Sequence, residues 1–256
     1  MPVSRKQLEI LAFPYTDYEC LICDGSIRSG KTSFMSIAFV DWMMENFDRK
    51  EFILLGKTVG SARRNVIAPL TNVAVMRERY GFRWRQTESA LEVTSGRRTN
   101  LWRVFGAKDT SSYQLIQGMT AAGMLCDEVA LCDRQAVEQA VARCSVPGSR
   151  LWFNCNPESP EHWFRREWIL QPEKHNAMHI HLTMDDNPAL DETKSSSDTS
   201  TPTTVFSRND TSTANGSWPR GLCTASRRRT AKSSRLTMTK YVMFQSTMES
   251  LTRSPR

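Results

Sequence analysis

The sequence predicts an α/β fold in which helices cover both faces of a mainly parallel sheet, forming a three-layer sandwich. Short apolar segments of strand character alternate with helical segments through residues 1–192, and this alternation is typical of parallel sheets. A glycine-containing turn joins the first strand to the first helix, and a later apolar strand ends in two acidic residues. Both features occur where such sheets place their functional loops.

The expected elements follow one another in a regular order. Residues 20–23 and 51–56 are short apolar runs, as expected of buried strands. Two further strands, at 91–93 and 101–105, flank a turn at Ser95-Gly96. The remaining strands are expected at 124–126 and 150–154, and the helices at 33–45, 63–70 and 134–144.

The composition argues against several classes of protein. No apolar run approaches the roughly 20 residues that span a bilayer, and no signal peptide is evident, so we expect a cytoplasmic protein without a membrane segment. Seven irregularly spaced cysteines argue against a disulfide framework. Cys20 and Cys23 have CxxC spacing but no partner pair, so buried strand thiols are expected. His179 and His181 would share one face of a strand, but no third metal ligand is evident.

The positive charge lies in one part of the chain. Of the net charge of +7, residues 193–256 carry 11 Lys or Arg against 3 Asp or Glu, and 26 of these 64 residues are Ser or Thr. Such a segment cannot bury enough apolar surface to offset its ordering entropy. We therefore expect a folded domain over residues 1–192, followed by a disordered, low-complexity tail over residues 193–256.

The turn after the first strand fits the phosphate-binding pattern GxxxxGK[ST] at every fixed position. Its residues are Gly25, Ser26, Ile27, Arg28, Ser29, Gly30, Lys31 and Thr32. Glycines let backbone N–H groups converge on phosphate oxygens. Lys31 is expected to reach the β- and γ-phosphates and the Thr32 hydroxyl to bind Mg²⁺, with the N-terminus of the next helix facing the same phosphates. The motif indicates a P-loop nucleotide triphosphatase, and we expect its three-layer fold to be of the RecA-like type.

A metal-binding acid is expected at the end of another strand. Asp127 and Glu128 directly follow the apolar strand at 124–126. Asp127 would bind Mg²⁺ and Glu128 would act as general base on the attacking water. The alternative is a pair of acids in a surface turn.

Three further positions have two interpretations each. Asn154 or Asn156 would contact the γ-phosphate or the lytic water, or would simply form a turn before Pro157. Arg28 would stabilise transition-state charge in cis, or would be a solvated loop residue; Arg143 is a weaker candidate from a neighbouring subunit. Arginine pairs offer possible DNA contacts, although solvated surface charge is the commoner explanation. These are Arg63 with Arg64, Arg77 with Arg79, Arg83 with Arg85, and Arg97 with Arg98. Trp152, Trp163 and Trp168 are expected to pack rather than to stack on bases.

These motifs together resemble phage terminase large subunits with an N-terminal ATPase. The resemblance covers about residues 4–190. Its most specific parts are the P-loop, Gln117-Gly118-Met119-Thr120 through Asp127-Glu128, residues 156–164 (NPESPEHWF), and residues 182–188 (LTMDDNP), which resemble the family's boundary segment.

The resemblance implies an ATP- and Mg²⁺-dependent motor that pumps double-stranded DNA into a prohead. It implies a homo-oligomeric ring that works with a small terminase subunit and a portal protein. By the same analogy Arg28 is the cis arginine, Asn154 to Pro157 couple hydrolysis to movement, and Gln7 reads adenine. Family members also carry a C-terminal nuclease, and nothing of that kind is evident after Glu192, so nuclease activity is expected to be absent.

Residues from Thr193 onward are expected to be a frameshift product. Back-translation into the frame in which the third base of each codon becomes the first base of the next permits GEWVxAEGLVY between Thr213 and Thr224, and YVSIDYGILNPF near the end of the chain. The second string resembles the first strand of the family's nuclease, and the first resembles its linker. Two rival hypotheses remain, namely another DNA-dependent P-loop ATPase of the helicase or repair type, and an inactive prophage remnant.

Overall fold

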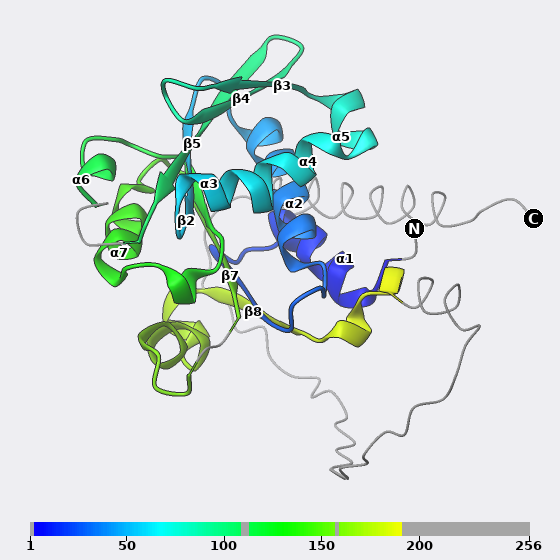
Figure 1. Cartoon of the computed structure of the whole chain (residues 1–256), viewed down its shortest axis with the longest axis vertical. Coiled ribbons are helices and arrows are strands. Elements are labelled where there is room, and N and C mark those ends of the chain that lie inside the picture. Colours follow the sequence, from blue (N-terminus) through cyan, green and yellow to red (C-terminus); the bar gives the residue numbers. More distant parts are fainter. Residues whose placement is uncertain (1–2, 109–112, 157–158, 191–256) are drawn as a thin grey trace, which may run out of the picture. The chain divides into compact units, whose positions relative to one another are not determined.

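The structure is a computed structural model that describes residues 3–108, 113–156 and 159–190 of the 256. Its centre is an eight-stranded sheet in the order β3-β4-β5-β2-β6-β7-β1-β8 (Figure 1). Six neighbouring strands, from β5 to β8 in that order, pair in parallel. At the other edge, β3, β4 and β5 pair antiparallel. The strands are β1 (Cys20–Gly25), β2 (Glu51–Gly56), β3 (Gly81–Arg85), β4 (Ala90–Ser95), β5 (Arg98–Gly106), β6 (Gly123–Cys126), β7 (Arg150–Cys155) and β8 (Ala177–Leu182).

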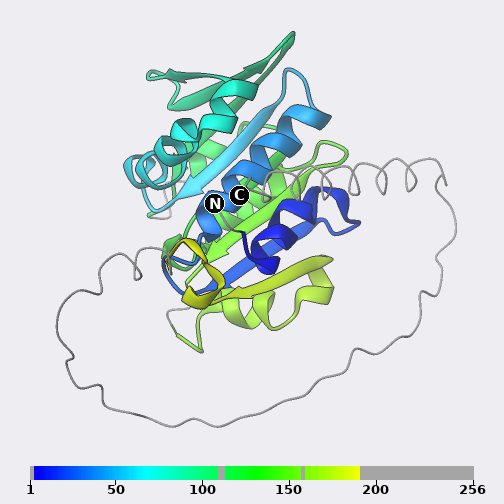
Figure 2. The ribbon, with the colours of Figure 1, turned by 90° about the vertical axis from the view of Figure 1, so that its right-hand side faces the viewer.

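Helices cover both faces of this sheet, which confirms the predicted α/β class with a mainly parallel sheet (Figures 1 and 2). One face carries α1 (Arg5–Ala12), α2 (Lys31–Asn46), α3 (Val59–Ala62), a π-helical turn (Arg63–Ile67), α4 (Ala68–Asn72) and α5 (Ala74–Arg79). The other face carries α6 (Tyr113–Ile116), α7 (Arg134–Arg143) and a second π-helical turn (Arg165–Ile169).

The core consists of two aromatic-rich layers, one on each side of the sheet. Strand β7 supplies both, because successive strand residues point to opposite faces. Trp152 faces the α2 layer, where Phe13 lies 4.6 Å from it between ring centroids. Phe153 faces the other layer, 4.9 Å from Trp168. Burial of each such ring contributes roughly 1.5–3 kcal/mol, and the expected packing role of Trp152 and Trp168 is confirmed.

The carboxyl end of α2 is capped by side chains from β5. The last carbonyls of a helix have no intrahelical partners. Arg98 donates to the carbonyls of Met44 and Glu45 at 2.7 and 2.6 Å, and the Asn100 amide donates to those of Met43 and Phe47. These bonds anchor the far end of the helix whose first turn carries Lys31 and Thr32.

Most of the elements expected from the sequence lie where they are predicted, and several further elements were missed. The segment 51–56 matches β2, the Ser95-Gly96 turn joins β4 to β5, and Cys20 and Cys23 are buried in β1. The helices α1, α5 and α6 and the strand β3 were not predicted from the sequence, and a strand was expected at His179 and His181 without the bounds of β8. The predicted boundary at 192 and the frameshifted tail lie outside the described residues. Among the residues described, no helix is long and apolar enough to cross a membrane.

Candidate nucleotide-binding site

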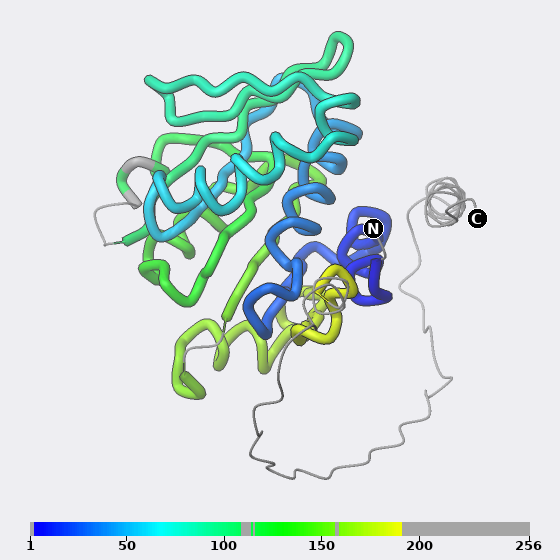
Figure 3. Tube along the Cα trace, turned by 45° about the vertical axis from the view of Figure 1, so that its right-hand side comes forward, coloured from blue at the N-terminus to red at the C-terminus, as the bar shows by residue number. Residues whose placement is uncertain are grey.

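The P-loop links β1 to α2 at the carboxyl edge of the parallel strands, as predicted (Figure 3). Three of its residues have positive φ angles: Gly25 (+118°), Arg28 (+63°) and Gly30 (+87°). A residue with a positive φ angle next to residues with negative φ angles turns successive backbone N–H groups toward one side of the loop. Helix α2 begins at Lys31, directly after Gly30, so its N-terminus and the loop amides face the same space.

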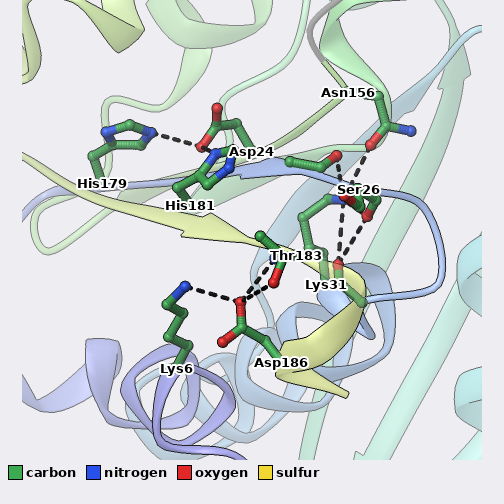
Figure 4. A network of polar contacts seen from close by, with 11 residues as sticks. Lys6, Asp24, Ser26, Lys31, Asn156, His179, His181, Thr183 and Asp186 are labelled. Atoms are coloured by element: carbon green, nitrogen blue, oxygen red, sulfur yellow. Dashed lines mark hydrogen bonds and ion pairs between the residues drawn. The ribbon is translucent and has the colours of Figure 1, made fainter. Parts of the chain in front are cut away.

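Lys31 lies inside the loop with only 5% of its surface exposed. Its ammonium donates to the carbonyls of Gly25 and Ser26 at 3.0 and 2.6 Å and to Asn156 Oδ1 at 3.0 Å (Figure 4). Burial lowers the pKa of Lys31, although the nearby charges of Asp24 and Asp127 partly oppose this. An anion beside Lys31 would therefore provide a counter-charge that stabilises the buried ammonium group. Asn156, predicted to contact the γ-phosphate or the lytic water, accepts a hydrogen bond from Lys31 in this structure.

Three polar side chains from three elements meet next to the loop. Thr32 Oγ1 lies 3.4 Å from Asp127 Oδ1, and the Asn154 amide donates to both at 2.7 Å. Among the described residues, Asn154 Oδ1 is buried without a hydrogen-bond partner. A hydroxyl and a carboxylate are ligands that suit Mg²⁺, which takes few protein ligands and keeps several waters. Thr32 and Asp127 thus fit the predicted metal site, and Asn154 is placed to orient both.

The acid pair after β6 has a perturbed electrostatic environment. Burial raises the pKa of Asp127, against hydrogen bonds from Asn154, Asn65 and Thr32 that lower it. Burial and the charge of Asp127 also raise the pKa of Glu128. A carboxylate with a raised pKa is a better base near neutral pH than an ordinary one.

The surroundings of Glu128 include positions that sequence reasoning did not connect to the site. Lys57 and Arg64 partly offset the raised pKa of Glu128 through their positive charges. Glu128 itself adopts a left-handed backbone (φ +53°), which is uncommon for residues other than glycine and often occurs at functional sites. Lys57 follows β2 and Arg64 lies in the π-helical turn; π-helical insertions are frequent at functional sites.

The other two predicted site residues have distinct surroundings. Arg28 lies on the exposed part of the loop, and its carbonyl accepts a bond from Asn187 at 2.6 Å. Gln7 is buried in α1, where its Oε1 accepts from the Ser4 N–H at 3.0 Å and its Nε2 donates to the Ser29 carbonyl at 3.1 Å. Gln7 thus contacts the P-loop backbone in this structure, and adenine recognition by Gln7 stays a prediction.

The two histidines and Asp24 form a cluster at the end of β1 (Figure 4). His179 Nε2 and His181 Nδ1 lie 2.8 and 3.1 Å from Asp24 Oδ1. Burial raises the pKa of Asp24, but the histidine hydrogen bonds outweigh it and the pKa falls below its ordinary value. Within the described ranges no group of three or more His, Cys, Asp or Glu side chains is arranged to hold a metal ion.

Several arginines considered for DNA contact have partners within the protein. Arg79 pairs with Asp41 at 2.9 Å, and Arg85 pairs with Glu88 at 3.1 Å and with Glu92. Arg63 lies over the Trp84 ring, 4.6 Å from its centroid. Together with Arg98 at the end of α2, these side chains have structural roles, and DNA contact stays a prediction for every arginine of the set.

Comparison with known proteins assigns the chain to a family. A family model described as "Terminase large subunit, T4likevirus-type, N-terminal" matches residues 22–212. The large terminase of a thermophilic bacteriophage, hereafter the thermophilic-phage terminase, is 46% identical with a TM-score of 0.69, over 73% of this chain and 47% of that one. Its complex with ADP matches equally well. Its complex with ATP-gamma-S is 43% identical with a TM-score of 0.69, over 76% and 48% of the two chains.

A more distant terminase structure has the same fold. The ATPase domain of the Thermus phage P74-26 large terminase has a TM-score of 0.53 at 15% identity, over 77% of this chain and 92% of that domain. This likeness shows the fold. No curated protein matches the sequence. The chain spans about half the length of the thermophilic-phage terminase. It belongs to the phage terminase large subunits, and its described residues have the fold of that family's N-terminal ATPase domain.

Proposed function

We propose that this chain binds and hydrolyses Mg-ATP and uses the energy to move double-stranded DNA into a prohead. The observation that carries the proposal is the convergence of Lys31, Thr32 and Asp127 with Asn154 and Asn156 at the carboxyl edge of the sheet. The thermophilic-phage terminase has been solved in complex with ADP and with ATP-gamma-S, which supports nucleotide binding by this chain.

Each site residue has a defined part in the proposed reaction. Lys31 and the loop N–H groups hold the phosphates, and Thr32 and Asp127 would hold Mg²⁺, which supplies positive charge to the phosphate oxygens. Glu128 takes a proton from the attacking water, which the raised pKa of its carboxyl favours. Arg28 stabilises charge on the transferred phosphoryl group from its exposed place in the loop.

Asn156 gives the proposed site a way to respond to the nucleotide. It accepts a bond from Lys31, and a γ-phosphate would compete with it for the same ammonium. Arrival and loss of the phosphate would therefore release and recapture Asn156 at the end of β7. We propose that this exchange couples hydrolysis to movement, and that it acts in the host cytoplasm within a homo-oligomeric ring, together with a small terminase subunit and a portal protein.

The experiment is phosphate release from ATP by the purified chain, with Mg²⁺ and with excess EDTA. Lys31→Ala should abolish Mg²⁺-dependent release and weaken nucleotide binding, because the phosphates lose their fixed cation. Lys50→Ala is the matched control, because Lys50 is exposed at the opposite edge of the sheet, before β2. Hydrolysis by Lys31→Ala at the wild-type rate would remove the P-loop from the mechanism. DNA-strand separation by the wild-type chain would favour the helicase or repair alternative, and nucleotide binding without turnover would favour an inactive remnant.

We also propose that residues 193–256 are a frameshift product and that the shifted frame encoded the family's nuclease. The family-like strings in one shifted frame support this. The gene sequence across these codons tests it directly: an open shifted frame is expected, and stop codons in that frame between positions 200 and 256 would contradict it.

A further inference from the structure

The start of the P-loop lies against β8 and the segment that follows it. Gly25 is in register with Leu182, and the Ser26 N–H donates to the Leu182 carbonyl at 2.8 Å. A Cβ atom at Gly25 would lie 1.9 Å from that carbonyl oxygen. Strand β8 therefore fixes where the loop leaves the sheet.

Two side-chain amides then hold two successive carbonyls of the loop. Asn187 Nδ2 donates to the Arg28 carbonyl at 2.6 Å, and Gln7 Nε2 donates to the Ser29 carbonyl at 3.1 Å. In a planar trans peptide the C=O and the N–H point in opposite directions. Fixing these carbonyls toward Asn187 and Gln7 therefore turns the N–H groups of Ser29 and Gly30 away from the two amides.

Asn187 is itself held in place. Its Oδ1 accepts from the Ala189 N–H at 3.3 Å, which leaves Nδ2 to point at Arg28. Pro188 restricts the preceding residue to extended backbone, and Asn187 has φ −115° and ψ +91°. Arg28, the residue that Asn187 contacts, has a left-handed backbone at φ +63°, which residues other than glycine rarely adopt.

An ion pair joins the two elements that supply the amides. Lys6 lies next to Gln7 in α1, and its ammonium contacts Asp186 Oδ2 at 2.8 Å (Figure 4). Asp186 in turn accepts from the Thr183 N–H and hydroxyl at 2.8 and 3.0 Å. The segment 183–187 and α1 thus form one connected support on the outer side of the loop.

We propose that Asn187 is a positioning residue for the phosphate-binding loop: by holding the Arg28 carbonyl, it aims the Ser29 N–H at the phosphate and fixes the direction of Arg28. Gln7 does the same for the next peptide group. This inference deepens the proposed function, on which it rests, because it assigns to the residues after β8 control over the geometry of the nucleotide site.

The test compares Asn187→Asp and Asn187→Ala with a matched control, Asn176→Asp. Asn176 also donates to a backbone carbonyl distant in sequence, that of Asp17 at 3.1 Å, outside the site. The readouts are amide hydrogen exchange of a peptide spanning residues 26–32, the Kd for ADP, and kcat and KM for ATP. Loss of one hydrogen bond that positions the loop should raise the Kd for ADP about 3- to 10-fold and speed exchange in this peptide. Exchange in β2 should not change, and Asn176→Asp should behave as the wild type.

The outcomes separate this inference from the proposed function. Wild-type loop exchange and wild-type ADP affinity in both Asn187 variants would overturn the role of Asn187, even if the chain hydrolyses ATP. If only Asn187→Asp differed from the wild type, the added charge would explain the effect and the inference would also fail. If the wild-type chain bound no nucleotide, the proposed function would fail, and the exchange measurement would still decide whether Asn187 holds the loop.

Discussion

Gly25→Ala tests the close contact between the P-loop and β8. Gly25 combines a φ of +118° with a packed environment, because an added Cβ would lie 1.9 Å from the Leu182 oxygen and 2.9 Å from its carbonyl carbon. Both atoms belong to the backbone of β8, so no rotamer change can relieve the clash. The strand or the loop must move. A matched substitution is Gly96→Ala in the β4–β5 turn, where φ is +58° and nothing lies within 4 Å.

The expected cost follows from these two environments. Forcing a side chain into an unfavourable backbone region costs about 1–3 kcal/mol, and overpacking typically adds about 1–3 kcal/mol. Gly25→Ala should therefore lower the free energy of unfolding by roughly 2–6 kcal/mol. Gly96→Ala should lower it by about 1–2 kcal/mol, from the left-handed backbone alone. For a domain of this size each kcal/mol corresponds to about 2–4 °C in Tm.

Thermal unfolding and ADP titration measure the two consequences. Gly25→Ala should lower Tm by roughly 4–24 °C and weaken ADP binding, because the loop can no longer leave the sheet at the same place. Gly96→Ala should lower Tm less and leave ADP binding unchanged. A Gly25→Ala variant that is no less stable than Gly96→Ala and binds ADP as the wild type does would show that the contact between Gly25 and β8 is unimportant.

Three further predictions concern charge and capping. Arg98→Ala should lower the free energy of unfolding by about 1–2 kcal/mol, because two carbonyls of α2 lose their donor. Urea unfolding measures this loss, and the control is Arg97→Ala, which should change stability by less than about 0.5 kcal/mol. Equal losses in the two variants would contradict the capping role. The folded-state pKa of Asp24 is lowered, so its stabilisation is present above the unfolded-state value of about 3.9 and is lost as pH falls through the folded-state value. Asp24→Asn should accordingly be less stable than the wild type at pH 7, with a difference that shrinks on acidification; a constant difference would argue against the charge. As the proposed general base, Glu128 would act deprotonated, and its pKa is raised, so kcat should fall on the acid side. Lys57→Ala should move that limb to higher pH by removing a charge that lowers the pKa. An unchanged limb would place Lys57 outside the site.

The nucleotide loop could be predicted from the sequence because its signals are local. The glycine pattern, Lys31 and Thr32 are contiguous, and they stand between an apolar strand and a helix. The position of Asp127 could be predicted equally well, because an acid directly after a short apolar strand in a parallel sheet must lie at the carboxyl edge of that sheet. These residues meet in the structure as expected.

The support around the loop could not be predicted in the same way. Asn187 meets Arg28 across 159 residues, and no local pattern encodes such a contact. Helix α1 did carry a readable signal, because Ser4 and Gln7 form a capping box. The role of Arg98 was hidden because the carbonyls that it caps belong to a helix far away in the sequence, so the charge appeared to be available for DNA.

We propose that Asp127 and Glu128 divide metal binding and general-base catalysis between them. The most direct test measures Mg-ATP affinity and single-turnover hydrolysis for Glu128→Gln and Asp127→Asn beside the wild type. Glu128→Gln should bind Mg-ATP with nearly wild-type affinity while hydrolysis slows by about 10²–10⁴-fold, and Asp127→Asn should require more Mg²⁺ for binding. Hydrolysis by Glu128→Gln at the wild-type rate, or the same binding defect in both variants, would contradict the claim.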